Sequence, residues 1–138
     1  MGLPPLLLLP GEQAYRAHYE AQYVRRTVKT FDGIPVRFYA DQFEHAFYGR
    51  AVHRGPKTAL DLARAQRMDW IGWCLGNDSL ELYRRRVKGD LRRLVLEPST
   101  PYVVVIEVRA GGTYGVFITA YVADDASTLP KIRSNNRW

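Results

Sequence analysis

Residues Tyr102–Asp124, YVVVIEVRAGGTYGVFITAYVAD, decide the fold that this sequence predicts. The segment Tyr102–Val108 is almost entirely β-branched or aromatic, which is typical of a strand with a packed face. Gly111 and Gly112 then allow a reversal, because glycine reaches positive φ without a steric penalty. A second apolar run, Tyr114–Val122, follows directly. The stretch therefore predicts a β-hairpin.

The returning strand of this hairpin carries two hydroxyl side chains. Thr119 and Tyr121 are two residues apart, so regular alternation places them on one face. The same alternation places Val116, Ile118 and Ala120 on the other face. A strand with one buried apolar face and two hydroxyls opposite could form the floor of a site, or it could be an ordinary solvated sheet face.

Two further strands are expected upstream of the hairpin. The runs Leu80–Val87 and Leu91–Glu97 flank a turn at 88–90, and 98–101 forms the next turn. The result is a four-stranded antiparallel meander. Six basic residues gather at its first turn: Arg84, Arg85, Arg86, Lys88, Arg92 and Arg93. Such a cluster repels itself unless a polyanion or counterions intervene, although a solubilising hairpin tip has the same composition.

The first half of the chain predicts helices and one short hairpin. Tyr15, Tyr19 and Tyr23 share one stripe of a helix over 12–24, which favours a core-facing aromatic face over a base-stacking platform. His18 lies off that stripe and is expected to be exposed. Asp32-Gly33 predicts a hairpin turn, and Pro35 indicates a strand at a sheet edge.

A second long helix is expected from Thr58 or Asp61 to about Leu75. Arg64 and Arg67 lie three apart and share one face of this helix, which could hold a phosphate or be simply solvated. The predicted fold class is α+β, with N-terminal helices packed on the four-stranded antiparallel β-meander. Residues 1–30 are expected to form an N-terminal arm and helix, and residues 31–138 the main domain.

His45 is the best acid–base candidate in the chain. It lies in ADQFEHAFYGR, where Asp41 can cap a short helix that turns Phe43, Ala46 and Phe47 inward. Imidazole exchanges a proton near neutral pH. Glu44 precedes His45, and Arg50, His53 and Arg54 follow it closely. A phosphate substrate would need such cations, but a hydrogen-bonded histidine at a helix end is the structural alternative.

Composition limits the classes of function. The chain has 138 residues and a formal net charge of +6, which favours anionic partners. A single cysteine, Cys74 among apolar neighbours, excludes a disulfide framework and any cysteine-built zinc site. The opening GLPPLLLLPG is too short for a signal peptide or a membrane span. We expect it to pack as an arm on the domain or on a partner chain, in a cytoplasmic protein or one delivered into a target-cell cytoplasm.

Several segments together resemble phage-associated members of the barnase/EndoU/colicin/RelE-like nuclease superfamily. They are FEHAFYG at 43–49, ARAQRMDWIGWCL at 63–75, YVVVIEV at 102–108, VFITAYVAD at 116–124 and KIRSNNRW at 131–138. These segments recur in order over residues 35–138. The resemblance implies a metal-independent endoribonuclease, toxin- or phage-effector-like, that cleaves RNA, including tRNA, by attack of the ribose 2′-OH on the adjacent phosphorus.

By this resemblance, site roles fall on matched positions. His45 would be the general base or acid, and Thr119 and Tyr121 would hold the phosphate or orient the 2′-OH. Arg64, Arg67 and Lys131 would stabilise the phosphorane, since charge without a metal needs preorganised cations. Arg50, Arg84, Arg86 and Arg133 complete the expected RNA-binding residues. No metal ion and no cofactor is expected, and the second acid–base group stays open between Glu44 and His53.

The resemblance also implies a cognate immunity or antitoxin protein as a partner. Two other functions remain open. A noncatalytic RNA- or DNA-binding module would use the same basic meander, and a phage structural or assembly protein would oligomerise through the N-terminal arm. No membrane partner is expected. Motifs for zinc peptidases, P-loops and dinucleotide sites are missing from the sequence.

Overall fold

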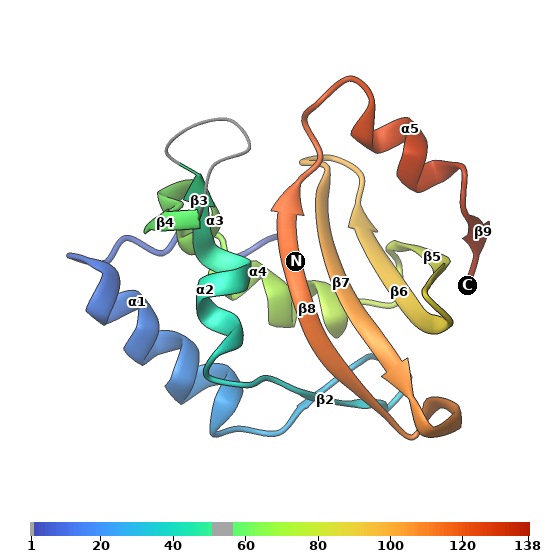
Figure 1. Ribbon diagram of the computed structural model, residues 1–138, viewed down its shortest axis with the longest axis horizontal. Coiled ribbons are helices and arrows are strands. Elements are labelled where there is room, and N and C mark those ends of the chain that lie inside the picture. The colour runs from blue at the N-terminus through green and yellow to red at the C-terminus, as the bar shows by residue number, and fades with distance from the viewer. Residues whose placement is uncertain (1, 51–56) are drawn as a thin grey trace.

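The computed structural model describes residues 2–50 and 57–138 and has a mixed α+β architecture (Figure 1). A seven-stranded sheet has the order β1-β2-β8-β7-β6-β5-β9. Its strands are β1 Val28–Lys29, β2 Pro35–Arg37, β5 Glu81–Val87, β6 Asp90–Glu97, β7 Tyr102–Arg109, β8 Tyr114–Val122 and β9 Asn136–Arg137. β3 Tyr48–Arg50 and β4 Lys57–Leu60 form a separate two-stranded sheet. The helices are α1 Glu12–Tyr19, η1 Glu20–Val24, α2 Gln42–Phe47, α3 Leu62–Gln66, α4 Met68–Leu75, η2 Ala110–Gly112 and α5 Thr128–Arg133.

The sheet is larger than the expected four strands. Strands β5 to β8 are antiparallel neighbours, but β9 extends one side, and β2 and β1 extend the other. β2 pairs with β8 in parallel, at Val36 opposite Gly115. A Cβ atom at Gly115 would lie 3.4 Å from the Ile106 side chain and 3.7 Å from that of Val36. These are ordinary van der Waals distances, so β2 and β7 pack closely around this position of β8.

Pro35 does not mark an edge strand, so that prediction is wrong. β1 is the edge, and β2 has a neighbour on each side. Pro35 is the first residue of β2 and pairs only with Lys29, while pairing with β8 begins at Val36. The hydrogen bonds between β2 and β8 therefore do not require an N–H group at the proline.

β7 is buried along nearly its whole length because both faces of the sheet are covered (Figure 1). On one face, here the helix face, Val104 and Ile106 join the core under α1 and α4. On the other, here the α5 face, Val103 and Val105 pack with Ile132 of α5. A strand covered on both sides reads as a continuous apolar run, which explains the composition of 102–108.

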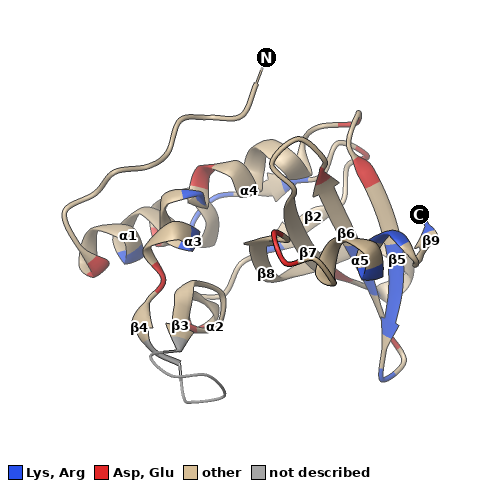
Figure 2. Cartoon of the chain, turned by 90° about the horizontal axis from the view of Figure 1, so that it is seen from above, with Lys and Arg blue, Asp and Glu red and all other residues tan. Residues whose placement is uncertain are grey.

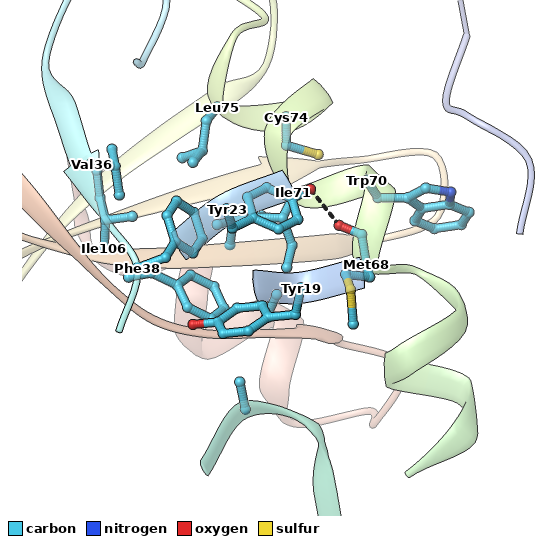
Figure 3. Close-up of a cluster of buried hydrophobic side chains, with 14 of the residues drawn as sticks. Tyr19, Tyr23, Val36, Phe38, Met68, Trp70, Ile71, Cys74, Leu75 and Ile106 are labelled. Carbon is cyan, nitrogen blue, oxygen red and sulfur yellow. Dashed lines mark hydrogen bonds between the residues drawn. The ribbon is translucent and has the colours of Figure 1, made fainter. Parts of the chain in front are cut away.

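The tyrosine stripe of the first helix faces the core, as the spacing predicts (Figure 3). Tyr15, Tyr19 and Tyr23 are buried, and each hydroxyl has a main-chain acceptor. Tyr23 donates to the carbonyl of Met68 at 2.6 Å, and burial raises the pKa of its phenol above the usual value. Buried polar groups need such partners. The helix and the sheet therefore share one core.

His18 is half-buried, not exposed as the stripe suggests. Its Nε2 lies 2.6 Å from Oδ1 of Asp69 on α4. The helical stripe fixes only which residues face the core, and it says nothing about a neighbour that approaches from the side. This contact joins α1 to α4.

The N-terminal arm packs on its own domain. Leu7 N–H donates to the carbonyl of Gln66 at 2.8 Å, and Trp70 Nε1–H donates to the carbonyl of Pro4 at 2.7 Å. Leu7 packs against the core, whereas Leu6 and Leu8 are exposed. This alternation is that of an extended segment with one face on the protein.

The expected long helix over 61–75 is two shorter helices, α3 and α4, with a break at Arg67. Asp61, not Thr58, caps the first, and its Oδ1 accepts from the N–H of Arg64 at 3.2 Å. Thr58 belongs to β4. Leu62, the first residue of α3, is exposed, while Ile71 and Leu75 of α4 face the core.

A β-bulge changes the facing of side chains on β8. Val105 is opposite Thr119, but Ile106 is opposite Phe117, so Ile118 is the extra residue. Ile118 consequently packs on the α5 face with Tyr121, and the prediction that it lies opposite Thr119 and Tyr121 is wrong. Strict alternation cannot anticipate a bulge.

Arg93 of β6 is the largest fully buried side chain, with 1% of its surface exposed. Its Nη1 and Nη2 donate to the two carboxylate oxygens of Asp32 at 2.9 and 2.7 Å. Asp32 lies in the turn between β1 and β2, where Gly33 adopts a φ of 86°. The hydrogen bonds from Arg93 hold the pKa of Asp32 well below its usual value. This ion pair fastens the β1–β2 turn to the centre of the sheet.

The substitution Asp32→Asn leaves the buried guanidinium of Arg93 without a counterion. We expect the free energy of unfolding at pH 7 to fall by about 2 kcal/mol, less than for a fully buried pair because Asp32 keeps some solvent. Urea unfolding of the variant against wild type measures this, with the exposed Asp78→Asn as the matched control.

The same pair gives the stability a pH dependence. The folded-state pKa of Asp32 is lowered, so its contribution is present above the unfolded pKa of about 3.9 and is lost as the pH falls below it. The difference between wild type and Asp32→Asn should therefore shrink between pH 5 and pH 2. A difference that stays constant over this range would contradict the assignment.

Candidate active site

A cavity of about 270 Å³ opens between α3 and the end of β8. Its lining comes from the loop before α3, from α3 itself, from the break at Arg67 and from the ends of β7 and β8: Asp61, Ala63, Arg64, Arg67, Tyr102, Tyr121, Val122 and Asp124. We call it the α3–β8 pocket. It brings together three expected site residues that are far apart in the sequence: Arg64, Arg67 and Tyr121.

Arg64 lies at the centre of the α3–β8 pocket. Its Nη1 donates to the carbonyl of Ala46 at 3.2 Å, and its Nε lies 3.7 Å from Oδ2 of Asp61. The guanidinium carbon is 5.8 Å from the ring centroid of Tyr121. Since a guanidinium has five N–H groups, these contacts leave it donors for a ligand.

Arg67 is held by main chain and by an aromatic ring. Its Nη1 donates to the carbonyl of Ala63 at 2.8 Å, and the guanidinium lies 5.1 Å from the ring centroid of Trp70. Its Nε is buried and has no acceptor among the described residues. Trp70 in turn donates to Pro4 of the N-terminal arm. The arm thus supports the ring on which Arg67 rests.

Tyr121 lies between two cations. Burial raises the pKa of its phenol, and the positive charges of Arg85 and Arg64 oppose that rise. The guanidinium of Arg64 on α3 lies near the ring, and Arg85 of β5 acts on the phenol through its charge from the same face of the sheet. Both charges favour the phenolate.

Arg85 is not among the substrate-binding residues expected from the sequence, whereas its neighbours Arg84 and Arg86 are. The register of β5 to β8 puts Arg85 on the α5 face with Thr119 and Tyr121, and puts Arg84 and Arg86 on the helix face. Arg84 lies 5.1 Å from the ring centroid of Trp138, and Arg86 donates to the carbonyl of Gly89. Neither therefore belongs to the same site as Tyr121.

Glu107 is a buried acid that sequence reasoning missed. It lies in the middle of β7 on the α5 face, and 5% of it is exposed. Its Oε1 accepts from Nε of Arg109 at 2.7 Å, and its Oε2 lies 3.8 Å from Nε of Arg92. Arg85 is opposite Arg92 on the next strand. The signal in the sequence was an acid inside an otherwise apolar strand, with an arginine two residues later.

Thr119 connects this acidic centre with Tyr121. On the α5 face, Thr119 is opposite Val105, and Glu107 is the next residue of β7 on that face. Such diagonal neighbours in a sheet are close enough for long side chains to touch. Tyr121, Thr119 and Glu107 thus follow one another along a single face, with Arg85 and Arg92 beside them.

His45 is exposed on α2, the helix that lies beside β8 (Figure 1). Phe43, Ala46 and Phe47 face the core, as expected. Gln42, one turn before His45 and so on the same side of the helix, donates from Nε2 to the carbonyl of Ile118 at 2.5 Å. His45 therefore lies on the side of α2 that meets the bulge of β8. Asp41 precedes α2 without a side-chain cap.

Lys131, Arg133 and Glu44, which the sequence also offers as site residues, lie elsewhere. Lys131 and Arg133 are exposed on α5, and Arg133 pairs with Glu81, which its guanidinium contacts at 3.0 Å. Arg50 ends β3, but its side chain, like His53 and Arg54, is outside the described part of the chain. Glu44, one of the two candidates for the second acid–base group, lies 3.4 Å from the guanidinium of Arg16. Lys131, Arg133 and Glu44 are not among the described residues that line the α3–β8 pocket.

Positive charge gathers along β5 in the direction of its turn (Figure 2). Among residues 2–50 and 57–138 there is no group of three acidic, histidine or cysteine side chains able to hold a metal ion. Within the same residues no helix is long and apolar enough to cross a membrane. Burial raises the pKa of the Cys74 thiol to about 12, as suits a core residue rather than a nucleophile.

Comparison with known proteins finds no relative: no family model, no curated protein and no solved structure matches this chain. The roles of the site residues are therefore inferred from the chemistry and geometry of this chain alone.

The two faces of β5 give a direct test of the site geometry. Arg85→Met should raise the pKa of Tyr121 further, because it removes a charge that favours the phenolate. Arg84→Met, one residue away on the opposite face, should leave it unchanged. Carbon-13 tyrosine NMR, with Tyr121→Phe to assign the resonance, measures both. Equal shifts in the two variants would contradict the placement of Arg85.

Proposed function

We propose that this protein is a metal-independent endoribonuclease that works on the α5 face of its sheet, beside α2. The proposal rests mainly on one observation: the buried carboxylate of Glu107 lies between Arg92 and Arg109, on the face that also carries Thr119 and Arg85. The resemblance to the nuclease superfamily supports the choice of RNA as the substrate.

A carboxylate among cations supplies two parts of such a reaction. Glu107 can accept the proton of the ribose 2′-OH, and Arg85, Arg92 and Arg109 can hold the phosphate whose charge increases in the transition state. Arg92 and Arg109 keep 29% and 46% of their side chains exposed, so they can meet a phosphate while they hold the acid. Thr119 can donate a hydrogen bond to a phosphate oxygen.

The second proton transfer is assigned to His45. The 2′-oxygen bonds to phosphorus as its proton passes to Glu107, and the bond from phosphorus to the 5′-oxygen breaks. The leaving oxygen takes a proton from the protonated imidazole of His45. The products are a 2′,3′-cyclic phosphate and a 5′-hydroxyl. This assignment replaces Glu44 as the partner of His45, since Glu44 faces Arg16, and His53 lies outside the described residues.

The test is cleavage of single-stranded RNA and tRNA by purified protein in EDTA. His45→Ala and Glu107→Gln should each reduce the rate roughly 100- to 10,000-fold, the usual contribution of a general acid or base. Glu44→Gln, the acid beside His45, is the matched control and should cleave at the wild-type rate. Products are identified by their 2′,3′-cyclic phosphate.

Two checks separate loss of chemistry from loss of fold. Thermal unfolding should show that His45→Ala keeps the fold, because His45 is not among the buried core residues. Glu107→Gln is destabilised, since it leaves Arg92 and Arg109 unpaired, and is compared below its melting temperature. Activity that requires Mg²⁺, or that survives in both variants, would reject the mechanism.

A noncatalytic RNA-binding module is the second candidate, favoured by the exposed arginines on the opposite face of β5. It predicts salt-sensitive RNA binding without cleavage. In that case the double variant Arg84→Ala, Arg86→Ala weakens binding, and His45→Ala leaves it unchanged. Under the nuclease proposal, Arg85→Ala is the more damaging change.

A further inference from the structure

We propose that Gln42 is a positioning residue, whose side chain holds α2, and with it His45, against the bulge of β8. The inference rests on the proposed function, in which His45 protonates the leaving 5′-oxygen. Gln42 takes no part in the proton transfers. It acts through the place that it gives to His45.

The outer edge of β8 has a neighbouring strand over only part of its length. β2 pairs with β8 at Gly115 and Val116. Among the described residues no strand continues on that side beyond Val116, and α2 lies beside β8 instead (Figure 1). Main-chain carbonyls at such an edge need a partner from outside the sheet.

Gln42 supplies this partner at the bulge. Its Nε2 donates to the carbonyl of Ile118 at 2.5 Å. Ile118 is the extra residue of the bulge, and Thr119 follows it directly. A bulge bends its strand and redirects the side chains around it. One hydrogen bond therefore joins the first residue of α2 to the bend of β8.

The opposite side of α2 is held by apolar contacts. Phe43 and Phe47 are buried, and their rings lie edge-on to the ring of Tyr19, with 5.6 and 5.7 Å between centroids. Apolar packing has no preferred direction, whereas a hydrogen bond does. α2 is only six residues long. Gln42 therefore determines how this short helix is rotated about its apolar side.

His45 depends on that rotation. It follows Gln42 by three residues, on the same side of α2, and it does not belong to the buried core. A displacement of about 1 Å can reduce the rate of a catalysed reaction about 100-fold. The arginines assigned to the phosphate come from β5, β6 and β7, not from α2. Loss of the Gln42 contact should therefore lower kcat and leave KM unchanged.

The variant Gln42→Leu in the full chain tests this inference by RNA cleavage in EDTA. We expect kcat to fall about 10- to 100-fold at an unchanged KM. Gln42→Glu keeps the shape of the side chain but has no donor when it is ionised, and it should show the same loss. Gln13→Leu, at an exposed glutamine of α1, is the matched control and should cleave as wild type does. A wild-type kcat in Gln42→Leu would overturn the inference and leave the nuclease intact.

A second substrate separates positioning from a structural role. It is the same RNA with sulfur in place of the 5′-oxygen at the mapped cleavage site. The 2′-oxygen bonds to phosphorus, its proton passes to Glu107, and the bond from phosphorus to sulfur breaks. The thiolate leaves without a proton, so the general acid is not needed. Gln42→Leu and His45→Ala should both cleave this RNA at the wild-type rate, and an equal loss on both RNAs in Gln42→Leu would reject the positioning role.

Two further measurements complete the test. The double variant Gln42→Leu, His45→Ala should cut ordinary RNA no more slowly than His45→Ala, because the two residues act as one unit. Proton NMR gives a readout that needs no activity: the ring resonances of His45 should shift or broaden in Gln42→Leu and not in Gln13→Leu. Unchanged resonances would overturn the inference. The change in a protein that cuts no RNA would keep Gln42 as the residue that holds His45 and reject the nuclease.

Discussion

A guanidinium buried at the centre of the sheet has to be neutralised, and the architecture depends on how this is done. Arg93 has 1% of its surface exposed, and both carboxylate oxygens of Asp32 accept hydrogen bonds from its guanidinium. An unpaired charge in such a place would cost far more than a typical side-chain contact contributes. The ring of Trp138 lies 4.3 Å from the same guanidinium. One charged group of β6 thus holds the β1–β2 turn and the chain that follows β9.

This requirement explains why the sheet has more strands than the central meander. The β1–β2 hairpin is short and would not be stable alone. The Asp32–Arg93 pair fixes its turn, and parallel pairing at Gly115 fixes its second strand beside β8. With β2 in place, Phe38 stacks on Phe117 at 4.8 Å between ring centroids, and the helix face is closed.

The closed helix face leaves the α5 face as the place for polar chemistry. α5 covers only part of it, with Ile132 over Val103 and Val105. Beyond that apolar patch, β5, β6 and β7 present Arg85, Arg92 and Glu107, and α3 brings Arg64 to Tyr121. The α3–β8 pocket, lined by two arginines and two aspartates, thus adjoins an arginine-rich surface, where we propose that the phosphate binds.

The sequence by itself determined the central strands, the tyrosine stripe and the Asp32-Gly33 turn, because each follows from local composition and period. It also named Arg64, Arg67 and Tyr121 as candidate site residues, and the structure brings these three together in one pocket. The sequence alone did not give the pairing of distant residues: the bulge at Ile118, the burial of Arg93, and the placement of Arg85 rather than Arg84 on the same face as Tyr121. A strand alternates its side chains by rule, but which face meets which helix is decided by packing. Glu107 shows the difference most plainly, since its neighbours are set by the register of three strands and no single stretch of sequence contains them.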